Sequence, residues 1–368
     1  MVPDPLVWNP QNPPTGEAPD QSVGINVTGV KRMSTVRILL LTLSAGCSEA
    51  YPVPPDAERL DLSALESGDT AAGNADSAAD DAAADDTAPT EEPAPIPCAG
   101  YGAPQQTGVV GDVALDELSG LAVSWKNPDI LWAMEDHAGE NAVYGLDAAG
   151  STVARIELTD VVNNDWEDLA VGPCGDDTCI FVGDIGDNSH DRPWHGVLRF
   201  PEPELTGVGV ETLSVTPDVF PYVYPDGNWD SESMAILPTG MPVLFSKEYD
   251  TAQSTAYSFA TLDAATTVTL DKRGRFATGA EGELGSAAAT SADLWPDGTR
   301  FVMRTYGHVW EYTLTPGGLD DLVNATRAEL ATGEERQGEA VGYDPGRPGF
   351  VTVSEGLNPP LYRVGCAE

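Results

Sequence analysis

Short apolar stretches separated by turns recur along the C-terminal part of the chain. The turns are rich in Pro, Gly or Asp, as at residues 238–240 and 296–298. These residue types favour tight turns between strands. No apolar periodicity of 3.6 residues persists over any length, so long helices are not expected. The pattern therefore predicts a succession of β-hairpins.

Five units begin with a similar core of apolar and small residues. First strands are expected around residues 119–122, 167–170, 232–235, 292–295 and 339–342. Second strands are expected at 130–134, 180–183, 242–246, 301–304 and 350–353, and third strands at 142–146, 197–200, 256–259, 309–314 and 361–364. Four short strands in each unit of ~40 to 50 residues are typical of a β-propeller. The sequence predicts an all-β propeller of five four-stranded blades, with six blades as the alternative.

The two ends of the propeller are expected to close the ring. The last unit has no room for a fourth strand after Val364. Residues 108–115 precede the first unit and are expected to fill that place. This closure would bring Cys98 and Cys366 together, and we expect a disulfide there that latches the ring and restricts the unfolded chain.

A basic segment, an apolar segment and a run of small residues follow one another before Cys47. Residues 31–37 are basic, residues 38–43 are apolar, and small residues then lead to the thiol. This order predicts a signal peptide, because the apolar run is too short to span a bilayer. The small residues before Cys47 resemble the lipobox of bacterial lipoproteins, which implies a lipid on that cysteine. Leu43 and Ser44 depart from the commonest pattern, and an ordinary secretory signal is the alternative.

The composition divides the chain into four parts. Residues 1–32 precede the signal and are expected to be untranslated, with Met33 as the true start, or disordered. Residues 33–46 are the predicted signal peptide, and residues 47–97 form an acidic tether too poor in apolar residues to fold. Residues 98–368 are the propeller domain. The predicted location is the bacterial cell envelope, lipid-anchored and either periplasmic or surface-exposed.

The charge and the cysteines narrow the range of partners. The chain has 59 acidic and 18 basic residues and a net charge of −41, which repels nucleic acid and anionic lipid surfaces. A solubilising or salt-adapted surface is the simplest explanation of this charge. Cys174 and Cys179 are expected to form a second disulfide in the first hairpin of the second blade. One odd cysteine and two plausible pairs indicate an oxidising compartment rather than a zinc site.

Several stretches resemble bacterial extracytoplasmic propellers, of which the nearest families are the SdiA-regulated and the esterase-like phytase propellers, within the wider TolB-like and NHL-like group. The stretches that carry the resemblance are residues 165–170, 183–188, 201–203, 247–248 and 304–306. The resemblance covers most of residues 110–365 and implies the same fold. It does not allow a catalytic set to be transferred residue by residue, so catalytic residues stay unassigned.

Polar residues are expected to gather at one mouth of the ring. In a propeller, the starts of the first strands and the ends of the second strands lie at the same face, so an unknown small molecule or protein partner is expected to bind there. Arg304 offers a fork of donors for a carboxylate or phosphate. The candidate ligand-binding residues are Glu167, Glu232, Glu339, Lys247, Arg304 and Tyr306.

A loop at the same mouth is a candidate calcium site. Asp184, Asp187 and Asn188 lie on a glycine-containing loop, and Ca²⁺ prefers several oxygen ligands in irregular geometry. We therefore expect Ca²⁺ as a cofactor at these residues.

Three functions stay open at this stage. The first is a membrane-tethered, monomeric propeller that binds a ligand or partner at the acidic mouth. The second is a metal-assisted hydrolase of phosphoester, ester or glycosidic bonds, in which paired carboxylates such as Glu167 and Glu232 act as acid and base. In the third, the mouth is structural, and its acids bond backbone amides of neighbouring blades or pair with Lys247 and Arg304. A serine nucleophile is not expected, because no Gly-x-Ser-x-Gly elbow is present.

Individual roles are also expected within the second unit. Trp166 and Leu169 should pack, Asp168 should hold a turn, and Glu167 is the first residue to test at the mouth. The Pro-Glu-Pro-Glu segment around Glu202 is expected to be a stiff, exposed turn.

Overall fold

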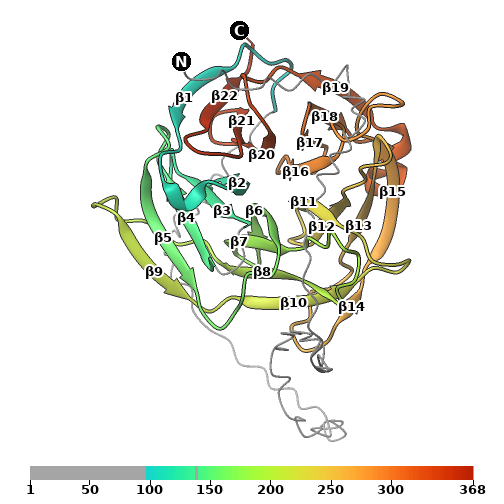
Figure 1. Ribbon diagram of the computed structural model, residues 1–368, viewed down its shortest axis with the longest axis horizontal. Coiled ribbons are helices and arrows are strands. Elements are labelled where there is room, and N and C mark those ends of the chain that lie inside the picture. Colours follow the sequence, from blue (N-terminus) through green and yellow to red (C-terminus); the bar gives the residue numbers. More distant parts are fainter. Residues whose placement is uncertain (1–96, 137–139, 368) are drawn as a thin grey trace, which may run out of the picture. The chain divides into compact units, whose positions relative to one another are not determined.

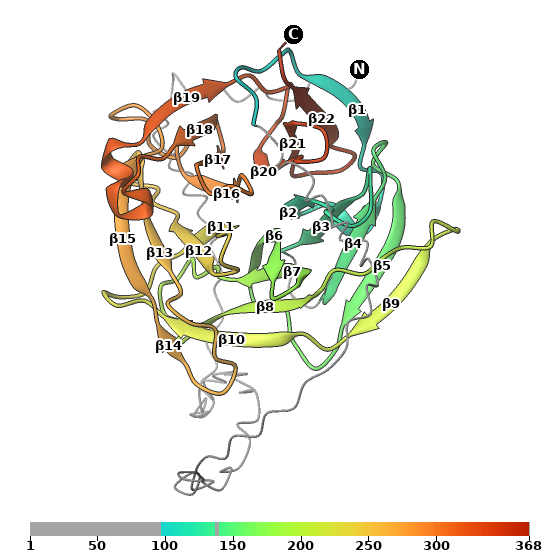
Figure 2. The same ribbon diagram turned by 180° about the vertical axis from the view of Figure 1, so that it is seen from behind.

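The computed structural model describes residues 97–136 and 140–367, which belong to one compact unit, Asp85–Glu368. Five β-sheets surround a common axis, so the protein is a five-bladed β-propeller (Figures 1 and 2). Five blades were the favoured prediction, and the six-bladed alternative is wrong. None of the helical segments in the described ranges is long and apolar enough to span a membrane. The predictions for residues 1–96, including a lipid on Cys47, lie outside the described residues.

Each blade is an antiparallel sheet whose first strand lies nearest the axis (Figure 1). Blade 1 consists of β2 (Leu118–Val123), β3 (Leu131–Glu135), β4 (Ala142–Leu146) and β5 (Thr152–Leu158). Blade 2 consists of β6 (Trp166–Cys174), β7 (Asp177–Asp184), β8 (His195–Pro201) and β10 (Asp218–Val223). Blade 3 consists of β11 (Ser231–Ile236), β12 (Pro242–Ser246), β13 (Gln253–Ser258) and β15 (Asp271–Ala277). Blade 4 consists of β16 (Ala289–Leu294), β17 (Arg300–Thr305), β18 (Val309–Thr313) and β19 (Thr326–Leu330).

Blade 5 is closed by the two ends of the domain. It consists of β20 (Gly338–Tyr343), β21 (Gly349–Ser354) and β22 (Pro360–Gly365), and β1 (Gln105–Val109) pairs antiparallel with β22. The predicted disulfide between Cys98 and Cys366 is present beside this pair. The closing strand lies earlier than predicted, because Asp112 caps a short 3-10 turn, η1 (Val113–Leu115), and this turn ends the extended chain.

In blades 2 and 3, the connection between the third and fourth strands adds a further strand on the outside of the ring. The segment between β8 and β10 forms β9 (Glu211–Val215), which pairs parallel with β5 of blade 1. The segment between β13 and β15 forms β14 (Val268–Thr269), which pairs parallel with β10 of blade 2. Each of these two linkers therefore ties its own blade to the preceding one.

Glu202 provides a second tie between blades 1 and 2. Its Oε1 accepts hydrogen bonds from Ser124 Oγ at 2.5 Å, from Trp125 N at 3.1 Å and from Trp132 Nε1 at 2.9 Å, all in blade 1 or the turn after β2. Its Oε2 accepts from Thr178 Oγ1 at 2.9 Å. The side chain is buried. The prediction of an exposed turn was wrong because the partners of Glu202 lie about 25 to 80 residues away in the sequence.

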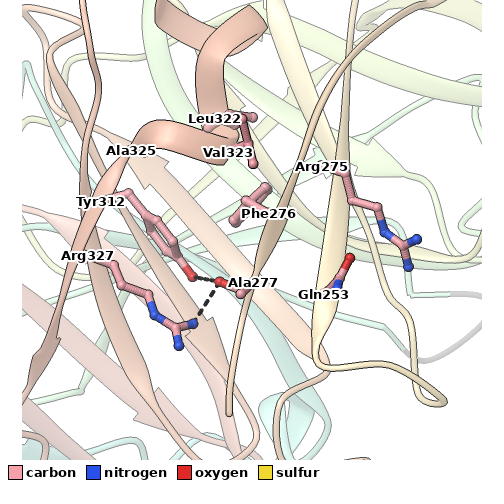
Figure 3. A pocket seen from close by; sticks show the side chains of 9 residues that line it. All are labelled: Gln253, Arg275, Phe276, Ala277, Tyr312, Leu322, Val323, Ala325 and Arg327. Atoms are coloured by element: carbon pink, nitrogen blue, oxygen red, sulfur yellow. Dashed lines mark hydrogen bonds between the residues drawn. The ribbon is translucent and has the colours of Figure 1, made fainter. Parts of the chain in front are cut away.

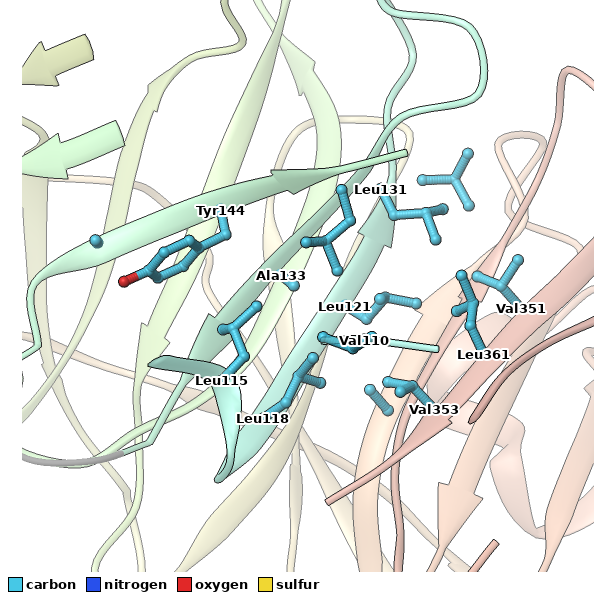
Figure 4. Packing of buried hydrophobic residues seen from close by; sticks show 14 residues of the cluster. Val110, Leu115, Leu118, Leu121, Leu131, Ala133, Tyr144, Val351, Val353 and Leu361 are labelled. Carbon is cyan, nitrogen blue, oxygen red and sulfur yellow. The ribbon is translucent and has the colours of Figure 1, made fainter. Parts of the chain in front are cut away.

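The hydrophobic core lies between neighbouring blades. Between blades 5 and 1, Leu118 and Leu121 of β2 pack in one cluster with Val351 and Val353 of β21 and with Leu361 of β22 (Figure 4). Three similar clusters fill the spaces between blades 2 and 3, 3 and 4, and 4 and 5. The inner strands are buried on both faces, which explains their mixture of apolar and small residues.

Small residues allow these inner strands to approach one another. A β-carbon at Gly120 would lie 2.6 Å from the backbone nitrogen of Leu169 in the next blade. Such a distance is a steric clash, so glycine is required where β2 approaches β6.

Asp168 ties three blades together near the axis. Its Oδ1 accepts from Leu169 N at 2.9 Å and from Ser291 Oγ at 3.1 Å. Its Oδ2 accepts from Met234 N at 2.8 Å and from Ala292 N at 3.1 Å. The carboxylate of β6 thus bonds both β11 and β16. The prediction that Asp168 holds a local turn was wrong, because three of its four donors come from other blades.

The first prediction concerns the two disulfides. The second predicted disulfide, between Cys174 and Cys179, is also present. Its cysteines are 5 residues apart in the sequence, whereas Cys98 and Cys366 are 268 residues apart. Loop-closure entropy grows with this separation, so replacing both cysteines of the long pair by Ala should cost about 5 kcal/mol of unfolding free energy and the short pair about 2 kcal/mol. Guanidinium unfolding of both double variants measures the difference. An equal or smaller loss for the long pair would contradict the latch.

The second prediction concerns the axial carboxylate. Asp168→Ala leaves buried donors of three blades without their acceptor, so the unfolding free energy should fall by about 3 to 5 kcal/mol. The matched control is Asp271→Ala, which removes an exposed aspartate from β15 and should change stability by less than about 1 kcal/mol. Urea unfolding of the two variants checks this, and similar losses for both would refute the role of Asp168.

Candidate functional site

A small cavity lies at one mouth of the ring and is lined mainly by carboxyl side chains. Its volume is about 70 Å³. The lining residues are Glu117, Leu118, Ser119, Asp136, Glu167, Glu232, Tyr306, Gln337, Glu339 and Glu355. The structure therefore brings four of the six candidate ligand-binding residues together, from blades 2, 3, 4 and 5. Their meeting agrees with the expectation that first-strand starts and second-strand ends share one face.

A β-bulge at the start of each inner strand aims these side chains at the mouth. The register with the second strand shifts once in every blade, and one residue of the inner strand is skipped. The five skipped residues are Ser119, Glu167, Glu232, Thr290 and Glu339. A bulged residue is unpaired in the ladder, so its side chain is re-aimed. The bulge thus accounts for three glutamates at equivalent places in three blades.

Two of the skipped positions were not among the predicted site residues. Ser119 lines the cavity and donates from Oγ to Glu167 O at 2.5 Å. Thr290 donates from Oγ1 to Gly338 O at 3.0 Å. Alignment of the repeats placed Ser119 beside Glu167, and this equivalence was the signal that could have identified it. The fourth unit was aligned from Ala292, two residues after the bulge, so Thr290 was missed.

Glu167 is the most buried acid of the cavity lining, with 3 % of its surface exposed. Burial raises the pKa of its carboxyl well above the usual range, and the negative charge of Asp165 raises it further, whereas Lys247 opposes the shift. A β-carbon at Gly186 would collide with Glu167 Oε1, so this glycine leaves room for the carboxyl group. The protonated form of Glu167 is therefore favoured relative to that of an exposed glutamate, and an approaching positive charge would favour the ionised form.

Glu339, at the equivalent bulge of blade 5, also has a carboxyl group with a raised pKa. Burial raises the pKa of its carboxyl to about 8, and the nearby charge of Glu355 contributes to the rise. Gln337 Nε2 donates to Glu339 Oε1 at 2.7 Å, which lowers the pKa in part. A second buried carboxyl of the mouth is thus poised to change its charge near neutral pH.

The mouth already contains one positive charge. Lys247 forms a buried ion pair with Glu232. Its Nζ lies 5.1 Å from the centre of the Tyr249 ring and 5.2 Å from the centre of the Tyr306 ring. Both distances suit a cation–π interaction. An ammonium group is therefore accommodated by one carboxylate and two aromatic rings at this mouth.

Arg304 is not part of the cavity lining. Its Nη1 lies 2.8 Å from Glu335 Oε2, and both side chains are buried. A β-carbon at Gly338 would collide with the guanidinium group, so Arg304 passes closely beneath the backbone of β20. Its predicted role as a fork for an anionic ligand is untested, but its charge is already balanced by Glu335.

The predicted calcium loop is engaged by neighbouring groups. Asp184 Oδ1 accepts from Arg192 Nη2 at 2.7 Å, and Asp187 Oδ1 accepts from the backbone nitrogen of Asp191 at 3.0 Å. Asn188 is exposed. Within residues 97–136 and 140–367, no group of three or more His, Cys, Asp or Glu side chains has the geometry of a metal site. Calcium at Asp184, Asp187 and Asn188 stays a prediction.

Comparison with protein-family models and with curated proteins finds no match. Among solved structures, the PQQ-bound form of an aldose sugar dehydrogenase from Streptomyces coelicolor is 12% identical with a TM-score of 0.42, covering 73% of this chain and 99% of its own. A glucose dehydrogenase is 10% identical with a TM-score of 0.39, covering 72% and 100%. A chain of the mitotic checkpoint complex is 12% identical with a TM-score of 0.32, covering 66% and 60%. At these values nothing about activity, substrate or cofactor is carried over to this protein.

The third prediction follows from the raised pKa of Glu339. The folded protein holds this proton up to about pH 8, whereas the unfolded chain releases it near pH 4.5, so stability should fall as the pH rises between these values. Glu339→Gln cannot ionise, and it should be more stable than the parent at pH 8.5 by on the order of 2 to 4 kcal/mol but similar at pH 4.5. Unfolding free energies across this range test it. Parallel curves for the two proteins would contradict the shift.

Proposed function

We propose that the propeller binds a positively charged group of a ligand or partner at its acidic mouth, with Ca²⁺ as the candidate inorganic ion. The observation that carries the proposal is the convergence of six carboxyl side chains on one cavity of about 70 Å³. The ion pair of Lys247 with Glu232 supports it, because an ammonium group of the chain itself is already held there. The small volume suits an ion or the charged end of a larger molecule rather than a whole drug-sized ligand.

Binding of a cation at this mouth is linked to proton release. The pKa values of Glu167 and Glu339 are raised mainly because their charged forms lose hydration. A bound cation stabilises those charged forms and therefore displaces protons from them. The affinity consequently increases with pH until both carboxyls are ionised.

The hydrolase alternative has weaker support. A phosphoester substrate requires cations that contact its anionic group. Lys247 and Arg304 are the predicted cations, and each is paired with a carboxylate, Glu232 and Glu335 respectively. An anion at the cavity would also face six acidic side chains. Electrostatics at the mouth therefore favour a cationic ligand.

The cellular setting belongs to the same proposal. The lipobox-like sequence before Cys47 supports a lipid anchor, and the acidic segment after it supports a tether. The two disulfides favour an oxidising compartment such as the periplasm or the bacterial surface. Membership of the extracytoplasmic propeller families named above, and a monomeric state, are further parts of this proposal.

The fourth prediction tests cation binding directly. Ca²⁺ and methylammonium are titrated separately into the protein by calorimetry at pH 6 and pH 8.5, in buffers with different ionisation enthalpies. At least one cation should bind about tenfold more tightly at pH 8.5 and release protons, because it competes with protons for Glu167 and Glu339. The comparison of the two cations identifies whether the site takes a metal ion or an ammonium group.

Two variants separate the mouth from the general acidity of the chain. Glu339→Gln should reduce the affinity about tenfold at pH 8.5 and reduce the proton release. Glu281→Gln removes an exposed acid elsewhere and should change neither quantity. Absence of binding by both cations, or equal effects of the two variants, would show that the mouth is not the binding site.

A further inference from the structure

A second cavity lies on the outer wall of the ring, between blades 3 and 4 (Figure 3). Its volume is about 320 Å³, which is in the range of small-molecule sites. The lining residues come from β13, β15, β18, β19, the 3-10 segment η2 (Gly318–Asn324) and the residue after it. They are Gln253, Arg275, Phe276, Ala277, Tyr312, Leu322, Val323, Ala325 and Arg327. None of them lines the acidic mouth, so this groove is independent of the proposed function.

The ionisable side chains that line this groove are basic, in contrast to the acidic composition of the chain. The chain has 59 acidic and 18 basic residues, yet the groove is lined by two arginines and by no carboxyl group. Figure 3 shows Arg275 and Arg327 on opposite sides, with Phe276 between them. A guanidinium group at this groove offers an anion a favourable contact on a chain whose net charge of −41 otherwise disfavours anions.

Arg327 is held in position without a carboxylate partner among residues 97–136 and 140–367. Its Nη1 donates to Ala277 O at 2.8 Å and its Nη2 donates to Gly279 O at 2.9 Å. The guanidinium carbon lies 4.3 Å from the centre of the Trp310 ring. The side chain is exposed and has five N–H donors, so donors remain for a ligand while the fork is already ordered.

Arg275 is ordered in a different way. It forms an ion pair with Glu248, whose side chain is mostly buried, while the arginine is 47% exposed. Its Nη2 also lies 3.4 Å from Thr251 Oγ1. The charge of Arg275 is therefore balanced by Glu248, while about half of its side chain stays exposed beside the groove.

The floor of the groove is apolar and its rim exposes a valine. Phe276, Tyr312 and Leu322 are buried side chains of one core cluster. Tyr312 donates its hydroxyl hydrogen to Ala277 O at 2.6 Å, so its ring rather than a free hydroxyl is presented. Val323 is 76% exposed at the rim. A ligand of this groove must therefore combine an anionic group with an apolar body.

We propose that this groove binds a small organic carboxylate with an apolar body. The carboxylate would accept hydrogen bonds from a guanidinium group, Arg327 above all, and the apolar body would cover the rim at Val323 and lie on the aromatic floor. Guanidinium groups suit planar carboxylates because two parallel N–H donors match the two oxygens. Burial of the apolar body supplies the remaining favourable free energy.

The fifth prediction compares three ligands of equal length. Octanoate, octanol and octylammonium are titrated below their aggregation limits and followed by calorimetry and by the melting temperature. Octanoate should bind at least tenfold more tightly than octylammonium at the groove, although the net charge of the chain favours the cation. Octanol should bind more weakly than octanoate because it lacks the carboxylate. Inorganic phosphate is titrated as well, to test whether a negative charge without an apolar body is sufficient for binding.

Matched variants locate the binding. Val323→Asp places a carboxylate at the rim and should weaken octanoate binding at least fivefold, whereas Val208→Asp changes a valine that is equally exposed, at 79%, on another part of the surface and should have no effect. Arg327→Lys keeps the positive charge but removes the paired N–H donors of the guanidinium group. It should weaken the binding of octanoate more than the binding of phosphate. No octanoate binding, tighter binding of octylammonium, phosphate binding as tight as octanoate, or equal effects of the two Asp variants would overturn the proposal. Octylammonium can also bind at the proposed cation site of the mouth, so tighter binding of it counts against the groove only where Val323→Asp changes that binding and Glu339→Gln does not.

Discussion

The structure depends on the close approach of five inner strands around one axis. These strands are buried on both faces, so their polar atoms have to be satisfied by neighbouring blades rather than by water. Asp168 does this for three blades at once, through donors on β6, β11 and β16. Gly120 and the other small residues keep the strands close enough for such contacts. Apolar clusters between the blades then supply most of the burial, and the disulfide of Cys98 with Cys366 fastens the closing blade.

The same inner strands produce the acidic mouth. A bulge in each blade removes one residue from the hydrogen-bonded ladder, and in three blades that residue is a glutamate. Such a position accommodates an ionisable side chain because the bulged residue is unpaired in the ladder and its side chain can turn toward the mouth. The cost is dehydration, which appears as the raised pKa of Glu167 and Glu339. Carboxyls whose charge is disfavoured without a partner are suited to binding a cation, and this links the packing of the ring to its proposed function.

Contacts between blades at the outer wall differ from those at the axis. Strands β9 and β14 come from linkers and pair with the preceding blade, so neighbouring blades share backbone hydrogen bonds at the rim. Between blades 3 and 4 no such strand is inserted; instead η2 packs near β15 and leaves a groove with two arginines. The two proposed sites of this propeller thus arise differently, one from repeated positions at the axis and the other where the repetition is broken.

The sequence by itself determined the features that repeat or lie near one another in the chain. Apolar cores at regular intervals and turns between them were sufficient for five blades, for the pairing of the cysteines and for the acids at one mouth. Only the tertiary structure decided the roles of Asp168, Glu202 and Arg304, since their partners come from other blades or loops. The groove at Arg327 was also invisible in the sequence, because it joins residues of β15 and β19. A repeat specifies which residues share a position within a blade, but it does not specify which side chains of different blades meet.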